Sequence, residues 1–201
     1  MLLGTALVAI FNKKDLKDDM SFIFVTKHGI IKKTGADNFA FKNSLLSITL
    51  KPDDELVSVI AVSKDIDILV YSKYGFGTRF NTKEIPDTKR MAIGVIGFPL
   101  AENDKVIGVQ ELAKHDDYIF LLTEKGYGKK CSLEVLAFKE RRSEPVSLIN
   151  LKEHDKVLAI INCNNKDYIH VVLKNNIYDI PMKEIKESMK FGIGDKLNQL
   201  S

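Results

Sequence analysis

Basic residues recur just after short turns in this sequence, and a second basic group follows each of the first three turns at a distance. The residues are Lys32, Lys33, Arg79, Lys129 and Lys130 after the turns, then Lys42, Lys89, Arg90, Arg141 and Arg142 in the succeeding loops. Lysine and arginine bind the phosphate backbone of nucleic acids with little preference for base sequence. A single lysine here would be read as an ordinary solvated turn residue. Because the positions repeat, we expect them to line up along one edge of the fold as a positive track.

Acidic residues recur at another position of the same repeat. They are Asp53, Asp54 and Glu55, then Glu102 and Asp104, then Glu153 and Asp155. We expect them to form an acidic edge, which would keep a nucleic acid from binding the wrong face. The net charge is only +3, so the prediction depends on where the charges lie and not on their sum.

Residues suited to catalysis, nucleotide binding or metal binding do not form a recognisable set. KYGFGT and EKGYGKK contain Gly-x-Gly, but neither continues as a phosphate-binding loop. The four histidines are scattered, and Cys131 and Cys163 have no metal-ligand spacing. Two unpaired cysteines fit a reducing compartment. We therefore expect no catalytic residue, no metal ligand and no cofactor.

The elements that position the charges come from an internal repeat of about fifty residues. Four segments, near 21–39, 67–85, 118–136 and 168–186, each read as a strand, a tight turn and a second strand. The turn residues are Gly29, Gly75, Gly126 and Asn176, since a tight hairpin needs a positive φ. A second motif alternates with the hairpins as DELVSVIAV, DKVIGVQEL and DKVLAIINC, and TALVAIF at 5–11 reads as another copy.

A repeat of short strands at this period predicts an all-β, propeller-like array of about four blades. Because one four-stranded blade cannot bury both faces, neighbouring blades must stack, and we expect residues 1–201 to form a single domain. We also expect strands to be exchanged between neighbouring blades and the divergent fourth copy to cap the array. The composition, 45% apolar and 28% charged, is that of an ordinary globular protein, and no apolar run is long enough to cross a membrane.

The hairpins KHGIIKKT, KYGFGTRF and EKGYGKK resemble the repeated hairpins in the C-terminal domains of the A subunits of DNA gyrase and topoisomerase IV. The resemblance extends from about residue 5 to residue 186. It implies a β-pinwheel, partial or open relative to six blades, whose basic rim binds and bends double-stranded DNA beside the DNA gate. The basic positions carried over from it are Lys32, Lys33, Arg79, Lys129 and Lys130. None of the six tyrosines is the catalytic one, which the family carries in another domain.

On this resemblance we expect a non-catalytic, cofactor-free domain of a bacterial, ATP-hydrolysing type IIA topoisomerase, cytoplasmic and associated with the nucleoid. Its partners would be double-stranded DNA, the ATPase B subunit and the remainder of a homodimeric A subunit, with no membrane partner. Gyrase carries a heptapeptide of the form QRRGGKG on its first blade. The nearest stretch here is FKERRSEPV at 138–146, so gyrase and topoisomerase IV both remain open.

Two other classes of function compete with DNA binding. A propeller can serve as a protein-interaction scaffold, since a fold does not determine a function. A scaffold should carry aromatic or apolar patches, whereas this sequence has 8% aromatic residues and no tryptophan. A propeller enzyme would need converging carboxylates or metal ligands, which the sequence does not offer.

Overall fold

The computed structural model describes residues 7–39, 45–112, 115–173, 175–188, 192–197 and 200. These residues form 14 strands and five short 3-10 turns. The strands assemble into four separate antiparallel sheets, which confirms the predicted all-β fold. In the described part of the chain no helix is long and apolar enough to span a membrane.

The first blade shows how one repeat becomes a sheet. Aromatic and β-branched residues in SFIFVT favour an extended strand, and Gly29, with φ of +77°, makes the tight turn to the next one. The blade has the strand order β3-β1-β2-β6. Its strands are β1 (Ser21–Thr26), β2 (Ile30–Gly35), β3 (Leu56–Val62) and β6 (Val95–Ile96).

The next two blades repeat this order. The second contains β4 (Asp67–Ser72), β5 (Phe76–Asn81), β7 (Val106–Leu112) and β10 (Val146–Ser147). The third contains β8 (Tyr118–Thr123), β9 (Tyr127–Ser132), β11 (Val157–Cys163) and β14 (Asp195–Lys196). The fourth comprises two described strands, β12 (Tyr168–Leu173) and β13 (Asn176–Pro181).

Strand exchange links each blade to the next. β6 follows the second hairpin in sequence but pairs with β2 of the first blade, and β10 and β14 do the same one and two blades later. The chain thus returns to the preceding blade after the second, third and fourth hairpins. This arrangement confirms the predicted exchange and the propeller-like pinwheel.

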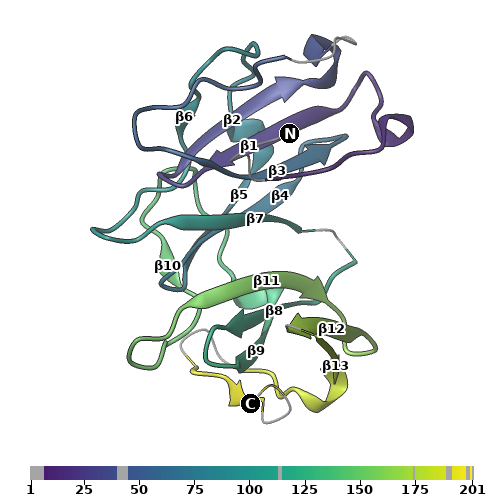
Figure 1. The fold of residues 1–201 in the computed structure, drawn as a ribbon, viewed down its shortest axis with the longest axis vertical. Coiled ribbons are helices and arrows are strands. Elements are labelled where there is room, and N and C mark those ends of the chain that lie inside the picture. The colour runs from purple at the N-terminus through teal and green to yellow at the C-terminus, as the bar shows by residue number, and fades with distance from the viewer. Residues whose placement is uncertain are drawn as a thin grey trace.

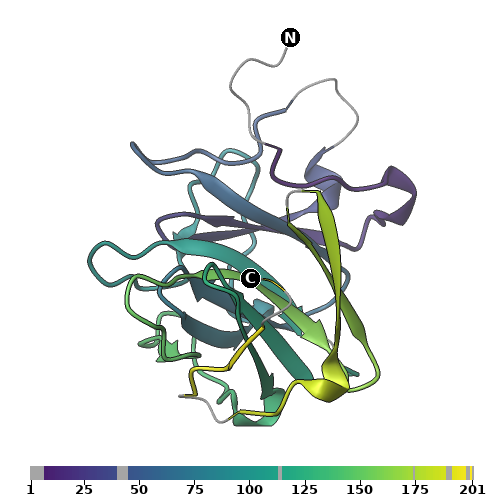
Figure 2. The ribbon, with the colours of Figure 1, turned by 60° about the horizontal axis from the view of Figure 1, so that its bottom comes forward.

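Apolar cores lie between successive blades. Ile23, Val25, Ile68 and Phe80 pack between the first and second blades, and two similar clusters join the second to the third and the third to the fourth. In Figure 1, β3, β7 and β11 follow one another down the middle of the molecule, and they contact one another in that order. Figure 2 shows β12 and β13 extending along one side of this stack. Both faces of an internal blade are therefore covered by neighbours.

Each hairpin is followed by a 3-10 turn. These turns are η2 (Ala36–Phe39), η3 (Thr82–Glu84), η4 (Leu133–Val135) and η5 (Met182–Glu184); another, η1 (Lys13–Asp15), precedes β1. The side chains of Asn81 and Ser132 cap η3 and η4 by accepting hydrogen bonds from backbone amides. The turns fix where the chain leaves one blade for the preceding one.

Two predictions about individual segments are wrong. Asn176 is not a turn residue: it opens β13 opposite Leu173, because the fourth hairpin is one residue shorter than the third. The copy of the alternating motif at 5–11 is not a strand over residues 7–11, while residues 5 and 6 lie outside the described part. Residues 8, 9 and 11 instead line a hollow together with Phe22 and Phe24 of the first blade, and the ring centres of Phe11 and Phe22 lie 5.3 Å apart.

Candidate nucleic-acid interface

The lysines that follow the hairpin turns lie inside the molecule. Lys32 and Lys129 are 1% and 0% exposed, and Lys33 and Lys130 are also buried. Arg79 is half-buried. The predicted position on a surface track is therefore wrong for the four lysines, because the faces of β2 and β9 are covered by neighbouring segments, whereas Arg79 is only partly covered.

Lys32 supports the loops beside the first blade. Its Nζ donates hydrogen bonds to the carbonyls of Ser47 and Arg90, at 2.5 and 2.6 Å, and lies 5.0 Å from the centre of the Phe24 ring. Lys129 has the same place in the third blade, where its Nζ donates to the Leu148 carbonyl at 2.5 Å. Burial lowers the pKa of each lysine to about 8, and for Lys32 the nearby charge of Arg90 contributes. These are structural amines that are expensive to bury and are stabilised by carbonyl acceptors.

Lys33, Arg79 and Lys130 form a second repeated contact, which we call the inter-blade clamp. Each reaches from the second strand of its hairpin to the carbonyl of the first residue in the next blade's 3-10 turn. The acceptors are Thr82 at 3.4 Å from Lys33 Nζ, Leu133 at 3.0 Å from Arg79 Nη1, and Met182 at 2.7 Å from Lys130 Nζ. The clamp joins neighbouring blades.

Carboxylates and an amide also contact the clamp residues. Arg79 donates from Nε and Nη2 to Asp67, at 3.2 and 2.9 Å, and Lys130 donates to Asn165 Oδ1 at 2.7 Å. Lys33 Nζ lies 3.5 Å from a carboxylate oxygen of Asp87. The positive charges of the clamp are thus partly balanced within the fold.

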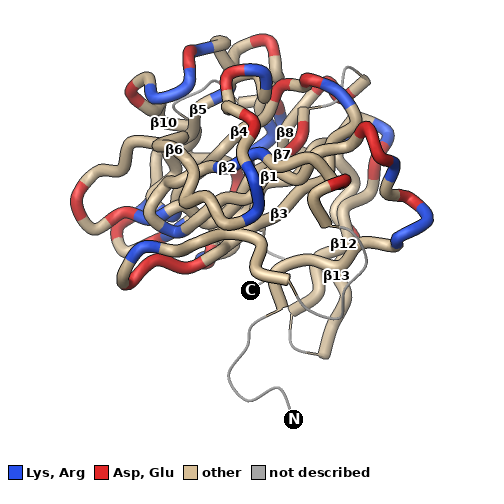
Figure 3. The backbone as a smooth tube through the Cα atoms, turned by 90° about the horizontal axis from the view of Figure 1, so that it is seen from above, with Lys and Arg blue, Asp and Glu red and all other residues tan. Residues whose placement is uncertain are grey.

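The repeated aspartates anchor the hairpin turns. Asp54 accepts hydrogen bonds from Thr26 Oγ1 at 2.7 Å and from the His28 amide at 2.9 Å. Asp104 accepts from Ser72 Oγ and the Tyr74 amide, and Asp155 accepts from the Lys125 amide. Each of these three aspartates anchors the turn of one of the first three hairpins. Figure 3 shows acidic and basic residues interleaved along the loops, which differs from the separate acidic and basic edges expected from the sequence.

Some of the exposed cations lie on three segments that we call the rim segments, residues 86–96, 137–147 and 186–196, while others such as Lys51, Lys125 and Lys152 lie elsewhere. Each runs beside the second strand of the preceding blade, starting at the parallel bridges Lys33–Asp87, Arg79–Phe138 and Lys130–Glu187. Within them Lys89, Arg142, Lys186 and Lys196 are exposed, whereas Arg90, Lys139 and Arg141 are half-buried. Residues 189–191 of the third segment, and Lys42, lie outside the described residues. The rim segments bring together four of the predicted site residues, Lys89, Arg90, Arg141 and Arg142.

Arg141 and Arg142 are adjacent but have different surroundings. Arg141 is bonded to the structure: its amide donates to Glu84 Oε2 at 2.6 Å, its Nε to the Glu84 carbonyl at 2.9 Å and its Nη1 to the Ile96 carbonyl at 2.5 Å. Arg142 has φ of 75° and is exposed. Of this pair, Arg142 is the one presented to solvent.

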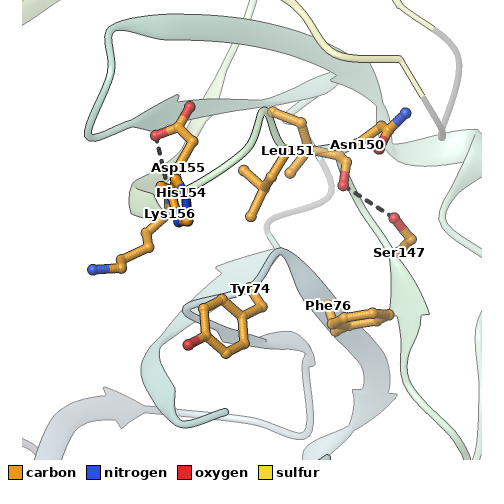
Figure 4. A pocket seen from close by; sticks show the side chains of 9 residues that line it. Tyr74, Phe76, Ser147, Asn150, Leu151, His154, Asp155 and Lys156 are labelled. Carbon is orange, nitrogen blue, oxygen red and sulfur yellow. Dashed lines mark hydrogen bonds between the residues drawn. The ribbon is translucent and has the colours of Figure 1, made fainter. Parts of the chain in front are cut away.

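A hollow of about 540 Å³ lies beside the hairpin turn of the second blade, and it was not predicted from the sequence. Tyr74 and Phe76, each 39% exposed, approach it from that turn. Leu151 and His154 face them across the hollow (Figure 4). Aromatic residues flanking a turn glycine are the sequence signal that could have indicated it. The described residues include no group of three or more His, Cys, Asp or Glu arranged to hold a metal ion.

Comparison with known proteins finds relatives among the A subunits of topoisomerases, all matched over one part of their length. A family model described as "DNA gyrase C-terminal domain, beta-propeller" matches residues 21–63, 67–111 and 117–164. The A subunit of DNA topoisomerase 4 from Staphylococcus epidermidis is 30% identical over 188 residues, which is 88% of this chain and 23% of that protein. The A subunit of DNA gyrase from Buchnera aphidicola is 28% identical over 169 residues, 83% of this chain and 20% of that protein. The chain thus spans under a quarter of the length of either relative.

Solved structures have the same fold. The C-terminal domain of DNA gyrase A superposes with a TM-score of 0.84 at 26% identity, covering 92% of this chain and 64% of that one. The C-terminal domain of DNA topoisomerase IV superposes with a TM-score of 0.83 at 24% identity, covering 91% and 58%. These comparisons confirm the resemblance of the hairpin motifs.

Proposed function

Because the chain belongs to the family of the DNA gyrase C-terminal, beta-propeller domain, we propose that it is a DNA-binding and DNA-bending accessory domain in the A subunit of a bacterial type IIA topoisomerase. The domain holds double-stranded DNA on its rim segments and directs it toward the DNA gate of the parent enzyme. It performs no covalent step itself.

The observation that carries this proposal is the placement of exposed cations on successive rim segments. Lys89 on the first segment, Arg142 on the second and Lys186 on the third all lie close to the bridge at which the chain meets the preceding blade. Phosphates lie every few ångströms along a duplex, so cations repeated from blade to blade fit its backbone without reading its sequence. A duplex that follows the curved edge of the array is bent by doing so.

The other partners follow from the same proposal. A homodimer formed by the remainder of the A subunit cleaves and rejoins DNA, and a B subunit hydrolyses ATP. Relatives named gyrase and topoisomerase IV match this chain at similar identity. The proposal therefore covers both gyrase and topoisomerase IV as the parent enzyme.

The test is binding of the 201-residue chain to a fluorescent duplex, followed by ligation of a nicked plasmid in its presence. We expect anisotropy to rise with a strong dependence on salt, and the ligated plasmid to show a shifted linking number after removal of the protein. Binding that is absent even at low salt would contradict the proposal. The sign of the linking-number shift distinguishes DNA that is wrapped with the handedness that gyrase gives it from DNA that is only bent.

One observation favours a second function, a protein-interaction scaffold. Tyr74 and Phe76 are exposed beside the hollow of the second blade (Figure 4), and exposed aromatic residues are enriched in protein interfaces. Tyr74→Ala and Phe76→Ala separate the two functions. A scaffold would lose its protein partner, whereas binding of duplex DNA by the rim would be unchanged.

A further inference from the structure

The turn at residues 89–92 of the first rim segment is held rigidly from beneath. The Lys89 carbonyl accepts a hydrogen bond from the Ala92 amide at 3.1 Å, which closes the turn. The Arg90 carbonyl accepts from Lys32 Nζ at 2.6 Å, and the Met91 carbonyl accepts from Thr49 Oγ1 at 2.7 Å. The Ala92 carbonyl accepts from the Thr49 amide at 3.4 Å. Every carbonyl of the turn is therefore bonded to the protein.

This anchored turn directs an apolar side chain into solvent. Met91 is 65% exposed, and Ile93 and Ile96 on the same segment are 42% and 45% exposed. Lys89 and Arg90 precede Met91 directly. An exposed methionine on an anchored turn, preceded in sequence by an exposed lysine and a half-buried arginine, has the chemistry to meet a polyanion with an apolar interior.

We propose that Met91 is a wedge that inserts between base pairs of duplex DNA and kinks it at the first rim segment. The proposal rests on the proposed function and adds to it a residue that bends the duplex. Lys89 and Arg90 hold the flanking phosphates while the thioether enters the stack. Proteins that kink DNA from the minor groove insert apolar side chains, methionine among them, in this way.

The second rim segment carries a different residue at the corresponding place. Its turn, residues 140–143, is closed by a hydrogen bond from the Ser143 amide to the Glu140 carbonyl at 3.0 Å. Arg142 therefore stands third in this turn, as Met91 does in the first. Arginine is drawn to a narrow minor groove by its negative potential. The two turns are thus suited to different tasks, a kink at Met91 and a groove contact at Arg142.

The experiment measures kinking separately from binding. A duplex with central TpA steps, the easiest to unstack, carries donor and acceptor dyes at its ends and 2-aminopurine at those steps. The unmodified chain and its Met91→Ala, Met91→Leu and Val172→Ala variants are titrated onto it. Val172 is the matched control, because it is also 65% exposed but lies on β12 of the fourth blade.

We expect Met91→Ala to lose at least half of both the energy-transfer change and the 2-aminopurine signal, with affinity falling less than tenfold. Met91→Leu should keep both signals, and Val172→Ala should match the unmodified chain. Equal kinking by Met91→Ala and the unmodified chain at saturation would overturn the wedge and leave the proposed function standing. Absence of binding by the unmodified chain would overturn both, so the two failures are distinguishable.

Discussion

The side-chain amine of Lys130 in the third blade donates a hydrogen bond to the carbonyl of Met182 in the fourth, at 2.7 Å and across 52 residues of sequence. The same amine donates to Asn165 Oδ1 at 2.7 Å and lies over the Tyr118 ring. Lys130, which the sequence pattern predicts to contact DNA, therefore joins the third blade to the fourth.

Lys130→Met tests this assignment. Methionine fills the same space but leaves two acceptors without their donor, and we expect the free energy of unfolding to fall by about 2 kcal/mol. Urea denaturation measures the change, and DNA affinity of the folded variant should stay within twofold. Lys89→Met on the rim serves as the control with the opposite pattern: we expect it to weaken DNA binding and to have little effect on stability. A variant of Lys130 that keeps full stability but loses DNA binding would contradict the clamp.

Glycine is required at the hairpin turns for two reasons, a positive φ at both Gly29 and Gly126 and a close approach of neighbouring atoms at Gly29 but not at Gly126. Gly29 and Gly126 both have φ near +77°, at 77° and 76°. A Cβ on Gly29 would collide with the carbonyl oxygen of Phe98, which is held close because the Phe98 amide donates a hydrogen bond to the Gly29 carbonyl at 3.1 Å. A Cβ on Gly126 would meet only the flexible end of Lys196 and the Cβ of Leu200, both at ordinary contact distance. We expect Gly126→Ala to cost about 1 kcal/mol from backbone strain and Gly29→Ala about 3 kcal/mol from strain and steric overlap. Equal thermal stability of the two variants would show that the approach of Phe98 is unimportant.

The arrangement of blades could be predicted from the sequence because hairpin, turn and repeat length are local properties. The position of the cations could not. Lys32 and Lys33 are consecutive residues of β2, so their side chains point to opposite faces of the strand. Each face is covered by other segments, and the acceptors at Ser47, Arg90 and Thr82 are distant in sequence.

Repetition itself is ambiguous as a signal. A repeated aspartate such as Asp54 recurs because it anchors a hairpin turn, and the basic residues Lys33, Arg79 and Lys130 recur because each joins two neighbouring blades. The rim cations Lys89 and Arg142 occupy different positions in their turns, so a search for repeated positions does not single them out. Residues that bind one ligand need only lie on the same surface, whereas residues that make the same structural contact in every repeat must lie at equivalent positions of the repeat.

Lys32 should make stability depend on pH in a defined direction. Its pKa is about 8 in the folded chain, lowered from 10.5 by burial and then by Arg90. Between these values the unfolded chain binds more protons, so the contribution of Lys32 to stability rises with pH from about 8 to about 10.5. We expect the stability of the unmodified chain minus that of Lys32→Met to increase between about pH 8 and about pH 10, as measured by urea denaturation. A difference that is flat or falls with pH would contradict the lowered pKa.

The rim cations should control the salt dependence of DNA binding. Each phosphate contact contributes roughly one unit to the slope of log Kd against log salt. We expect Lys89→Ala to lower the slope by about one and to weaken binding at low salt. Fluorescence anisotropy over a series of salt concentrations measures both quantities.

The clamp gives this measurement its control. Lys33 lies on the same blade as the first rim segment, but it is buried and its Nζ donates to the Thr82 carbonyl. Lys33→Met removes one positive charge, as Lys89→Ala does, so an effect of net charge alone would be the same for both. A slope that changes for Lys89→Ala and not for folded Lys33→Met locates the DNA on the rim. Equal changes for the two variants would mean that the duplex responds to the overall field, and that the rim segments are not its specific contact.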